Sequence, residues 1–191
     1  VFMDHKKSIL LNSFVEYVRS LLGMIQENFT YESVFRYLRS GYCEFTEDEI
    51  DRLENYCLAL GIKGYKKWQQ AWARKTKEAD EEEVEKLNHL RVKFVEKIDP
   101  LMFVSRQKKK TVLDITLAVY EFIAGEHLQE KLEQQQKFFA EQGELTLAKE
   151  YEQIYRIVME LFDKFSELLG DEPITLKEYC ELLDAGFEEA K

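Results

Sequence analysis

The residues in this sequence best suited to binding chemistry are cations interleaved with aromatic rings, between positions 63 and 75. The candidate contacts for a nucleic acid are Lys63, Lys66, Lys67, Trp68, Trp72, Arg74 and Lys75. At helical spacing Tyr65, Trp68 and Trp72 share one face, and the cations flank it. Aromatic rings can stack on unpaired bases while cations neutralise phosphates, so the pattern is typical of single-strand binding. It is equally typical of aromatic rings buried in a core, with lysine stems packed around them.

Patterns for catalysis, nucleotide binding or metal binding are absent from the sequence. It contains no G-x-x-x-x-G-K-[ST] loop to hold the phosphates of ATP, and its three histidines show no zinc-ligand spacing. No serine or cysteine has the surroundings of an activated nucleophile. Cys43, Cys57 and Cys180 include no C-x-x-C pair, so we expect reduced thiols in a cytoplasmic protein. We therefore predict no catalytic residue, cofactor or metal in this chain.

The charge balance limits how strongly the chain could hold nucleic acid by itself. With 37 acidic and 27 basic residues, its formal net charge is −10. Phosphate neutralisation dominates nucleic-acid affinity, so we expect an acidic domain to bind DNA weakly and without sequence preference. No apolar run approaches the roughly 18 residues that a membrane span requires, and no signal peptide is recognisable. We expect contact with DNA and none with a membrane.

The elements that must position these residues are predicted to be helices. Hydrophobic residues make up 45% of the 191, and only two prolines and eight glycines occur among them. Threonines can cap helix N-termini at four places, namely Thr30, Thr46, Thr111 and Thr175. Glu49, Asp114 and Glu178 stand at the third helical position after the last three, which predicts capping boxes. We predict an all-α fold, one irregular multi-helix bundle over residues 8–191, after a severed strand or disordered lead-in over residues 1–7.

Three further features of the helices are predicted from local pattern. The first long helix is expected to begin at Ser8. The step from Asp99 to Pro100 is expected to interrupt the helix that follows the acidic run 76–83, because proline lacks an N–H donor. The interruption would be either a kink or a fresh helix start with Asp99 as its cap. Apolar residues repeat in heptads from 147 to 168. That repeat suits the central helix of a bundle, and it also suits an intermolecular coiled coil.

Three stretches carry a resemblance to a known family. They are YESVFRYLRSG at 31–41, EIDRLENYCLALGIKG at 49–64 and DEPITLKEY at 171–179. Their order and spacing resemble the AddB/RexB family, the B-type subunits of ATP-dependent helicase/deoxyribonuclease. The resemblance implies that the chain is an internal helical piece of a larger subunit. That subunit pairs with a helicase–nuclease partner to process DNA double-strand breaks for recombinational repair.

The resemblance also implies a role for this piece. It would be an accessory domain of the 2B type, inserted in the second motor domain, contacting DNA weakly or bracing the motor. ATP, magnesium and an iron–sulfur cluster are implied for the parent enzyme, yet this chain lacks a cysteine quartet for such a cluster. The piece itself is expected to have no activity of its own. A helical scaffold that docks a partner subunit is the alternative from a different class.

Overall fold

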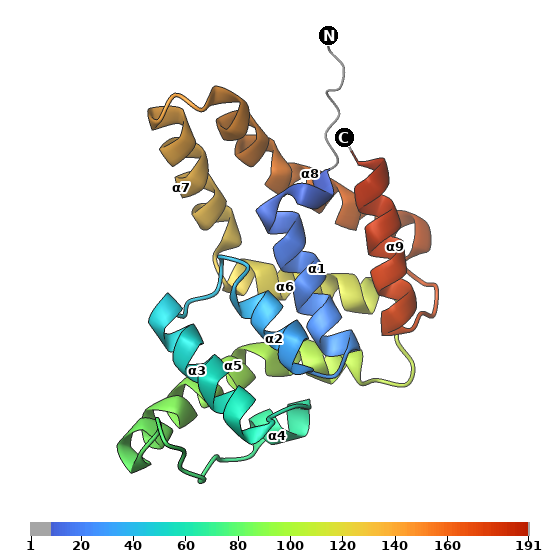
Figure 1. Ribbon diagram of the computed structural model, residues 1–191. Coiled ribbons are helices and arrows are strands. Elements are labelled where there is room, and N and C mark those ends of the chain that lie inside the picture. The colour runs from blue at the N-terminus through green and yellow to red at the C-terminus, as the bar shows by residue number, and fades with distance from the viewer. Residues whose placement is uncertain (1–8, 191) are drawn as a thin grey trace.

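Helices account for 75% of the residues that the computed structural model describes, which are residues 9–190 (Figure 1). A short 3₁₀ helix, η1 (Ile9–Leu11), precedes the α-helices. In chain order these are α1 (Ser13–Gln26), α2 (Tyr31–Leu38), α3 (Glu47–Leu60), α4 (Tyr65–Gln69), α5 (Glu81–Ser105), α6 (Val112–Gly125), α7 (Leu128–Glu141), α8 (Leu145–Leu169) and α9 (Leu176–Glu189). No strand occurs within residues 9–190, so the predicted all-α bundle is confirmed. The lead-in predicted over residues 1–7 lies outside the described residues.

The hydrophobic core is built around α1. Apolar residues spaced by three and four cover more than half of its circumference, and nine of its 14 residues are buried. Phe14 near its start and Val18 near its middle are both fully buried. The elements η1, α2, α8 and α9 pack around it, and Figure 1 shows α1 in the centre of the molecule. The first α-helix of the described chain is therefore its most enclosed one.

Three helices begin with the capping boxes that the sequence predicts. The backbone N–H of Thr46 donates to Glu49 Oε1 over 2.9 Å, and the N–H of Glu49 donates to Thr46 Oγ1 over 3.1 Å. The same reciprocal pair forms at the start of α6, where the partner is aspartate, and at the start of α9. Each box satisfies two backbone donors that a helix N-terminus otherwise leaves without partners.

The starts of α6 and α9 are held together by backbone hydrogen bonds. Thr111 and Pro173 form an isolated antiparallel bridge. Beside it the N–H of Val112 donates to Glu172 O over 3.0 Å, and the N–H of Ile174 donates to Lys110 O over 3.1 Å. These bonds satisfy the polar backbone of two loops that are far apart in sequence.

The first helix does not begin where the sequence suggests. Ser8 lies outside the described residues, and α1 begins at Ser13 after the short η1 turn. Asn12 is its cap, because its side chain accepts a 2.8 Å hydrogen bond from the N–H of Phe14. Asparagine is as good a cap as serine, so pattern alone could not separate the two positions.

The fresh helix start predicted at Asp99 and Pro100 does not occur, because α5 runs through Pro100 as one helix. Proline removes the hydrogen bond to the carbonyl four residues earlier, which belongs to Glu96. Glu96 and Pro100 are both exposed, so water can hydrate that carbonyl. On the other side of the helix Ile98 and Leu101 are each 1% exposed. Their burial keeps both halves of α5 against the core.

The heptad pattern belongs to α8, which forms an antiparallel hairpin with α7 (Figure 1). Ile154, Val158 and Phe165 are buried against neighbouring helices of the same chain. Leu168, at the end of the pattern, is 75% exposed. The seam from 154 to 165 is therefore internal to the chain, as expected for a bundle helix.

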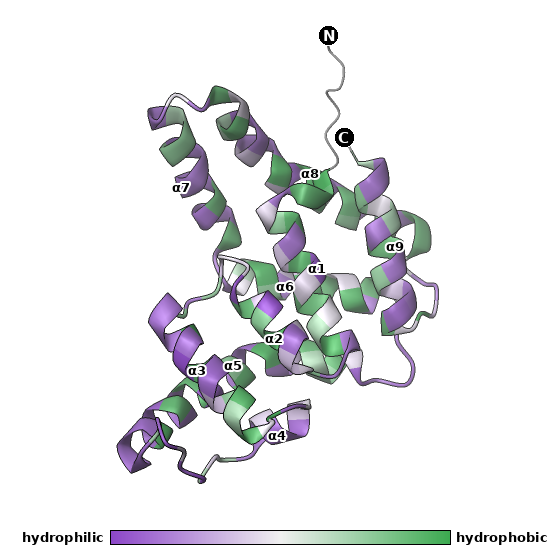
Figure 2. Cartoon of the chain, viewed as in Figure 1, coloured by the Kyte–Doolittle hydropathy of each residue, from purple (hydrophilic) through white to green (hydrophobic). Residues whose placement is uncertain are grey.

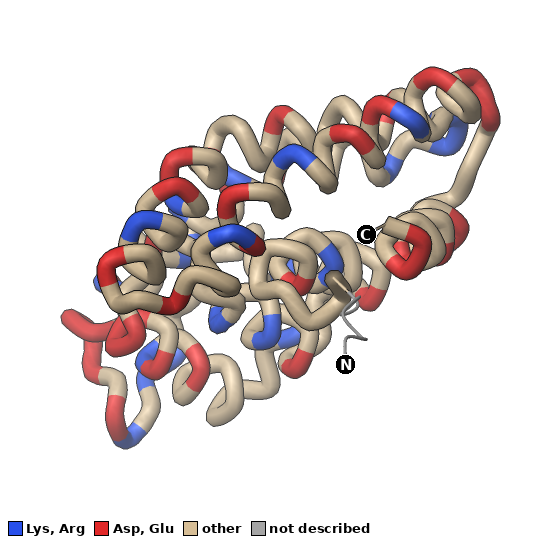
Figure 3. Tube along the Cα trace, turned by 90° about the horizontal axis from the view of Figure 1, so that it is seen from above, with Lys and Arg blue, Asp and Glu red and all other residues tan. Residues whose placement is uncertain are grey.

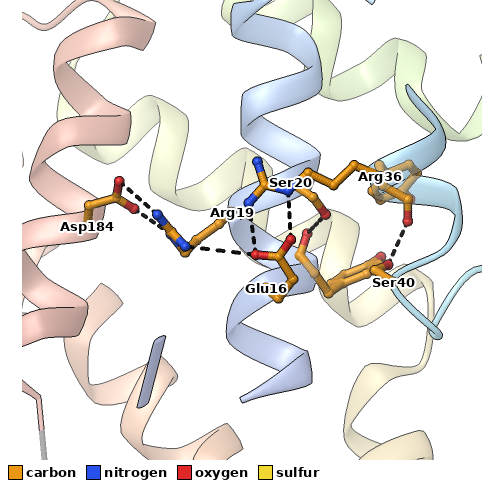
Figure 4. A network of polar contacts seen from close by, with 8 residues as sticks. Glu16, Arg19, Ser20, Arg36, Ser40 and Asp184 are labelled. Atoms are coloured by element: carbon orange, nitrogen blue, oxygen red, sulfur yellow. Dashed lines mark hydrogen bonds and ion pairs between the residues drawn. The ribbon is translucent and has the colours of Figure 1, made fainter. Parts of the chain in front are cut away.

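A network of ion pairs joins α1 to α2 and to α9 (Figure 4). Arg36 donates to both carboxylate oxygens of Glu16, over 2.7 and 2.8 Å. Arg19 donates from Nε to Asp184 Oδ1 over 2.8 Å. These side chains are partly exposed, so each pair contributes only about 0.2–1 kcal/mol. The network orients the helices, while apolar burial supplies most of the stability.

Candidate nucleic-acid interface

The segment that carries the predicted cations begins with two glycine turns after α3. Gly61 has a φ of 62°, in the left-handed region that glycine adopts without strain. Gly64 has a φ of 88°, and its N–H donates to Phe29 O over 3.0 Å. The turn is thereby fixed to the connection between α1 and α2. Lys63 lies between the two glycines and is exposed.

The aromatic rings of this segment point into the core. Trp68 is 1% exposed, and its ring centroid lies 4.7 Å from that of Phe94. Trp72 is 7% exposed, and its ring lies 5.2 Å from that of Tyr56. Stacking on a base requires a free ring face, so these two buried rings are poorly placed to stack on DNA bases. Their burial favours the alternative interpretation, aromatic anchors in a core.

The helix predicted to carry all three aromatic residues ends early, because tertiary hydrogen bonds replace helical ones. α4 stops at Gln69, and the chain then runs without regular structure to α5. Asn88 of α5 accepts from the N–H of Trp72 over 2.9 Å and donates to the Trp72 carbonyl over 2.8 Å. The Tyr56 hydroxyl donates to the Arg74 carbonyl over 2.6 Å. Side chains of α3 and α5 therefore hold the backbone of residues 70–75 in place.

Arg91 is a buried cation beneath the same segment. It is 7% exposed, and it donates to the Trp68 carbonyl over 2.7 Å and to Asn88 Oδ1 over 2.8 Å. Its guanidinium lies 5.9 Å from the Trp72 ring centroid, which adds a cation–π contact. Burial lowers the pKa of Arg91, but arginine remains protonated in proteins. Arg91 thus positions the segment from below and does not belong to its outer surface.

The cations of the segment point outward. Those that are exposed are Lys63, Lys66, Lys67, Arg74 and Lys75. None of them forms an ion pair with another of the residues 9–190. Lys67 and Arg74 line one shallow depression of about 190 Å³, whose other wall is the C-terminal end of α3 at Gly61 and Ile62. Trp72 lines the same depression, so the structure brings three of the predicted contacts together, and it leaves all five cations free to approach an anion.

Arg106 is a cation near this surface that the sequence pattern does not reveal. It is exposed just after α5, and its guanidinium lies 5.0 Å from the Tyr65 ring centroid. Tyr65 itself is buried and donates its hydroxyl to Asp99 over 3.0 Å. No local signal links position 106 to position 65, because the contact depends on how α4 packs on α5. We call the five exposed cations together with Arg106 the basic surface.

Acidic residues border the basic surface. Glu78 and Asp80 follow Lys75 within five residues along the chain, and the first turn of α5 adds three glutamates. Lys77, next in the segment, lines a small depression among these carboxylates. Figure 3 shows acidic positions along most helices, with basic positions among them. The basic surface is therefore local, and it acts against the negative field of the whole chain.

The described residues include three free cysteines, and the surroundings of each thiol can be compared with what a metal or a cluster needs. No group of three potential metal ligands occurs among the described residues. Burial raises the pKa of Cys57 to about 12 and those of Cys43 and Cys180 to about 11, which keeps all three protonated at neutral pH. An iron–sulfur cluster takes four cysteine thiolates, so these residues do not fit one. Within residues 9–190 no helix has the length and apolar character that crossing a membrane requires.

Comparison with known proteins identifies relatives over the whole chain, although no family model matches it. The chain is 44% identical to the B-type subunit of ATP-dependent helicase/deoxyribonuclease from Lachnoclostridium phytofermentans, over 100% of the chain and 17% of that protein. Proteins of the same name from Clostridium novyi and Clostridium acetobutylicum are 37% and 35% identical over 100% of the chain, and the match covers 16% and 17% of their lengths. The chain thus spans about a sixth of the length of these curated relatives. The resemblance noted in the sequence is confirmed, for one segment of those proteins.

Proposed function

Because the chain is homologous along its whole length to one segment of the B-type subunit of ATP-dependent helicase/deoxyribonuclease, we propose that it serves in such a subunit as a non-catalytic helical domain. The parent would process DNA double-strand breaks for recombinational repair, together with a helicase–nuclease partner subunit, in the cytoplasm. The 2B position, inserted in the second motor domain, is the place we propose for it. An all-helical body with capped, well-packed elements is suited to bracing a motor.

In this proposal the helical domain contacts the phosphate backbone of DNA. The observation that carries the proposal is the basic surface, in which five exposed cations have no carboxylate partner among the described residues and stand on a rigidly held backbone. Backbone contacts carry no sequence information. The burial of Trp68 and Trp72 favours a contact through the cations over one through base stacking. The contact should therefore be non-specific and dependent on salt.

The affinity of the 191-residue chain by itself should be low. At a net charge of −10, we expect a dissociation constant of about 10⁻⁴ M or weaker at physiological salt, the weak limit of non-specific binding. In the complete complex other domains would hold the DNA nearby, which raises the effective concentration of phosphate at this surface. A weak contact is then enough to guide a strand.

The test reverses two charges at the centre of the basic surface, Lys66→Glu with Lys67→Glu. Fluorescence anisotropy at low ionic strength should show weaker binding to labelled DNA, with helix content unchanged because both side chains are exposed. The slope of log affinity against log salt should decrease in magnitude by about 1.4 to 1.8, the contribution of two phosphate contacts.

The matched control is Lys149→Glu with Lys164→Glu on α8. These lysines are also exposed, and their reversal changes the net charge by the same amount at a site remote in sequence. If the control weakens binding as much as the α4 variant, only net charge matters and the basic surface is not the DNA contact. If neither variant changes binding or DNA processing by the complete complex, the DNA path lies elsewhere.

The second part of the proposal is that this chain has no catalytic activity of its own. The sequence has no phosphate-binding loop, and the described residues hold no metal-ligand group and no activated thiol. The purified chain should therefore neither hydrolyse ATP nor cleave DNA when magnesium is added. Turnover that stays with the protein through successive purification steps would contradict this part of the proposal.

A further inference from the structure

A long groove runs along the outer side of the α5–α6 hairpin. It has a volume of about 890 Å³, room for several side chains. Leu101 and Phe122 form part of its buried floor. Phe103 and Leu117 stand at its sides, 69% and 49% exposed. Exposed aromatic and aliphatic side chains beside a cavity of this size are typical of an interaction surface.

The composition of α6 gives a second reason to expect that another polypeptide segment packs over this groove. Asp114 and Glu121 are its only charged residues, and Figure 2 shows most of the helix coloured as hydrophobic. A helix that is apolar around its circumference is expected to be buried on more than one side. α6 packs against α5, α7, α8 and α9, yet Leu117, which lines the groove, remains 49% exposed.

The charges around the groove indicate which kind of segment it can bind. Lys97 pairs with Glu44 over 2.8 Å and with Glu126 over 2.9 Å, so this cluster is internally satisfied. Glu121 lines the groove and forms no ion pair with another residue of the described chain. Lys109 and Lys110 lie at the end of the groove where α5 passes into α6. A complementary occupant therefore carries a cation opposite Glu121 and an acid near the two lysines.

From these observations we infer that the groove binds an amphipathic helix from another part of the same full-length polypeptide. Its apolar face would pack on Phe103 and Leu117, with a lysine or arginine opposite Glu121. More than four fifths of each relative lies outside the matched segment, so the parent has ample chain to supply such a helix. A segment of the same polypeptide is already at high effective concentration, whereas a separate chain must first lose translational and rotational freedom. The inference rests on the proposed place of this chain in a larger subunit, and not on DNA binding.

The test measures how fast a cysteine in the groove reacts with N-ethylmaleimide, using Leu117→Cys. The three native thiols are buried or half-buried with raised pKa values, so they should react slowly and the new thiol is the reporter. It should react rapidly in the 191-residue chain. The same measurement is then made on the full-length polypeptide that contains this chain, purified without its partner subunit. We expect labelling there to be about tenfold slower or more. That ratio corresponds to a free-energy difference of at least about 1.4 kcal/mol in favour of the covered groove.

A charge reversal then tests how the occupant is recognised. Glu121→Lys, combined with Leu117→Cys, should restore fast labelling in the full-length polypeptide. Glu133→Lys on α7 is the matched control, since Glu133 is exposed and distant from the groove, and it should leave the protection intact. A photocrosslinking amino acid at position 103 should attach to a peptide of the same polypeptide, identified by mass spectrometry as an amphipathic helix.

Three outcomes would overturn the inference. Equal labelling rates in the short and full-length chains would show that nothing covers the groove. Protection that requires the partner subunit would make that subunit the occupant. Protection in the 191-residue chain that increases with its concentration would indicate a second copy. None of these readouts involves DNA, so the inference can fail while the proposed DNA contact stands.

Discussion

Gly23 and Gly186 should respond in opposite ways to the same substitution by alanine. Both lie inside α-helices, where alanine is intrinsically favoured over glycine by about 1 kcal/mol. A Cβ added at Gly23 would meet no heavy atom within 4 Å. We therefore expect Gly23→Ala to raise the free energy of unfolding by about 0.5–1 kcal/mol.

At Gly186 the added methyl group would meet α8. Its Cβ would lie 2.8 Å from Leu161 Cδ1 and 2.9 Å from Phe165 Cζ. Phe165 is 6% exposed, with its ring edge-on to that of Tyr179 at 6.3 Å, so it has little room to move. Overpacking lowers the free energy of unfolding by about 1–3 kcal/mol, and the higher helix propensity of alanine raises it by about 1 kcal/mol. We expect Gly186→Ala to lower the free energy of unfolding by about 1 kcal/mol, some 2 kcal/mol below Gly23→Ala.

Urea unfolding followed by far-ultraviolet circular dichroism measures this difference directly. In thermal unfolding 1 kcal/mol shifts the midpoint of a domain of this size by about 2–4 °C, so the two variants should differ by about 4–8 °C. The reasoning is refuted if Gly186→Ala is as stable as Gly23→Ala. That result would mean that the contact between α8 and α9 is loose enough to admit a methyl group.

Four further variants test a cap, the core and an ion pair by the same unfolding assay. Thr46→Ala should cost about 1 kcal/mol through its lost cap, and an unchanged midpoint would mean that α3 does not depend on it. Ile154→Ala should cost about 2–5 kcal/mol, whereas Leu168→Ala, at 75% exposure, should stay within about 0.5; equal losses would contradict the internal seam. Arg52 donates to Glu83 over 2.7 Å, and this hydrogen bond lowers the pKa of Glu83. The resulting stability is present above the unfolded pKa of about 4.3 and is lost as the pH falls through the lower folded pKa. Glu83→Gln should therefore lower stability at pH 7 and flatten its decline below about pH 4, and an unaltered pH profile would show that the pair contributes nothing.

The parts of this fold that the sequence predicts are those decided within a few residues. The capping boxes that begin with Thr46, Thr111 and Thr175 all form, because cap and partner are three positions apart and need no tertiary contact. The left-handed turn at Gly61 follows from the same local chemistry. Pro100 shows the limit of local reasoning. Its cost is real, but burial of the residues around it outweighs that cost.

The candidate site is predicted only in part, for a physical reason. The sequence shows which side chains are cationic and aromatic, but only packing decides which of them face solvent. Asn88 and Arg91 are decisive for the shape of the segment, since they bind its backbone at Trp68 and Trp72. They lie on another helix, and hydrogen bonds from a side chain to a distant backbone leave no periodic signal. The α5–α6 groove was missed because its residues come from two helices whose relative placement the pattern does not give.

The burial of α1 has a consequence for how the chain is made. α1 is the first α-helix of the described chain to leave the ribosome, and α9, against which it packs, is the last. About 150 residues separate the end of α1 from the start of α9, and at 5–20 residues per second they take roughly 8 to 30 s to synthesise. During that interval α2 can cover one side of α1, while the side meant for α9 stays open to chaperones and to aggregation. The length of this exposure is set by the speed of translation, and not by the sequence alone.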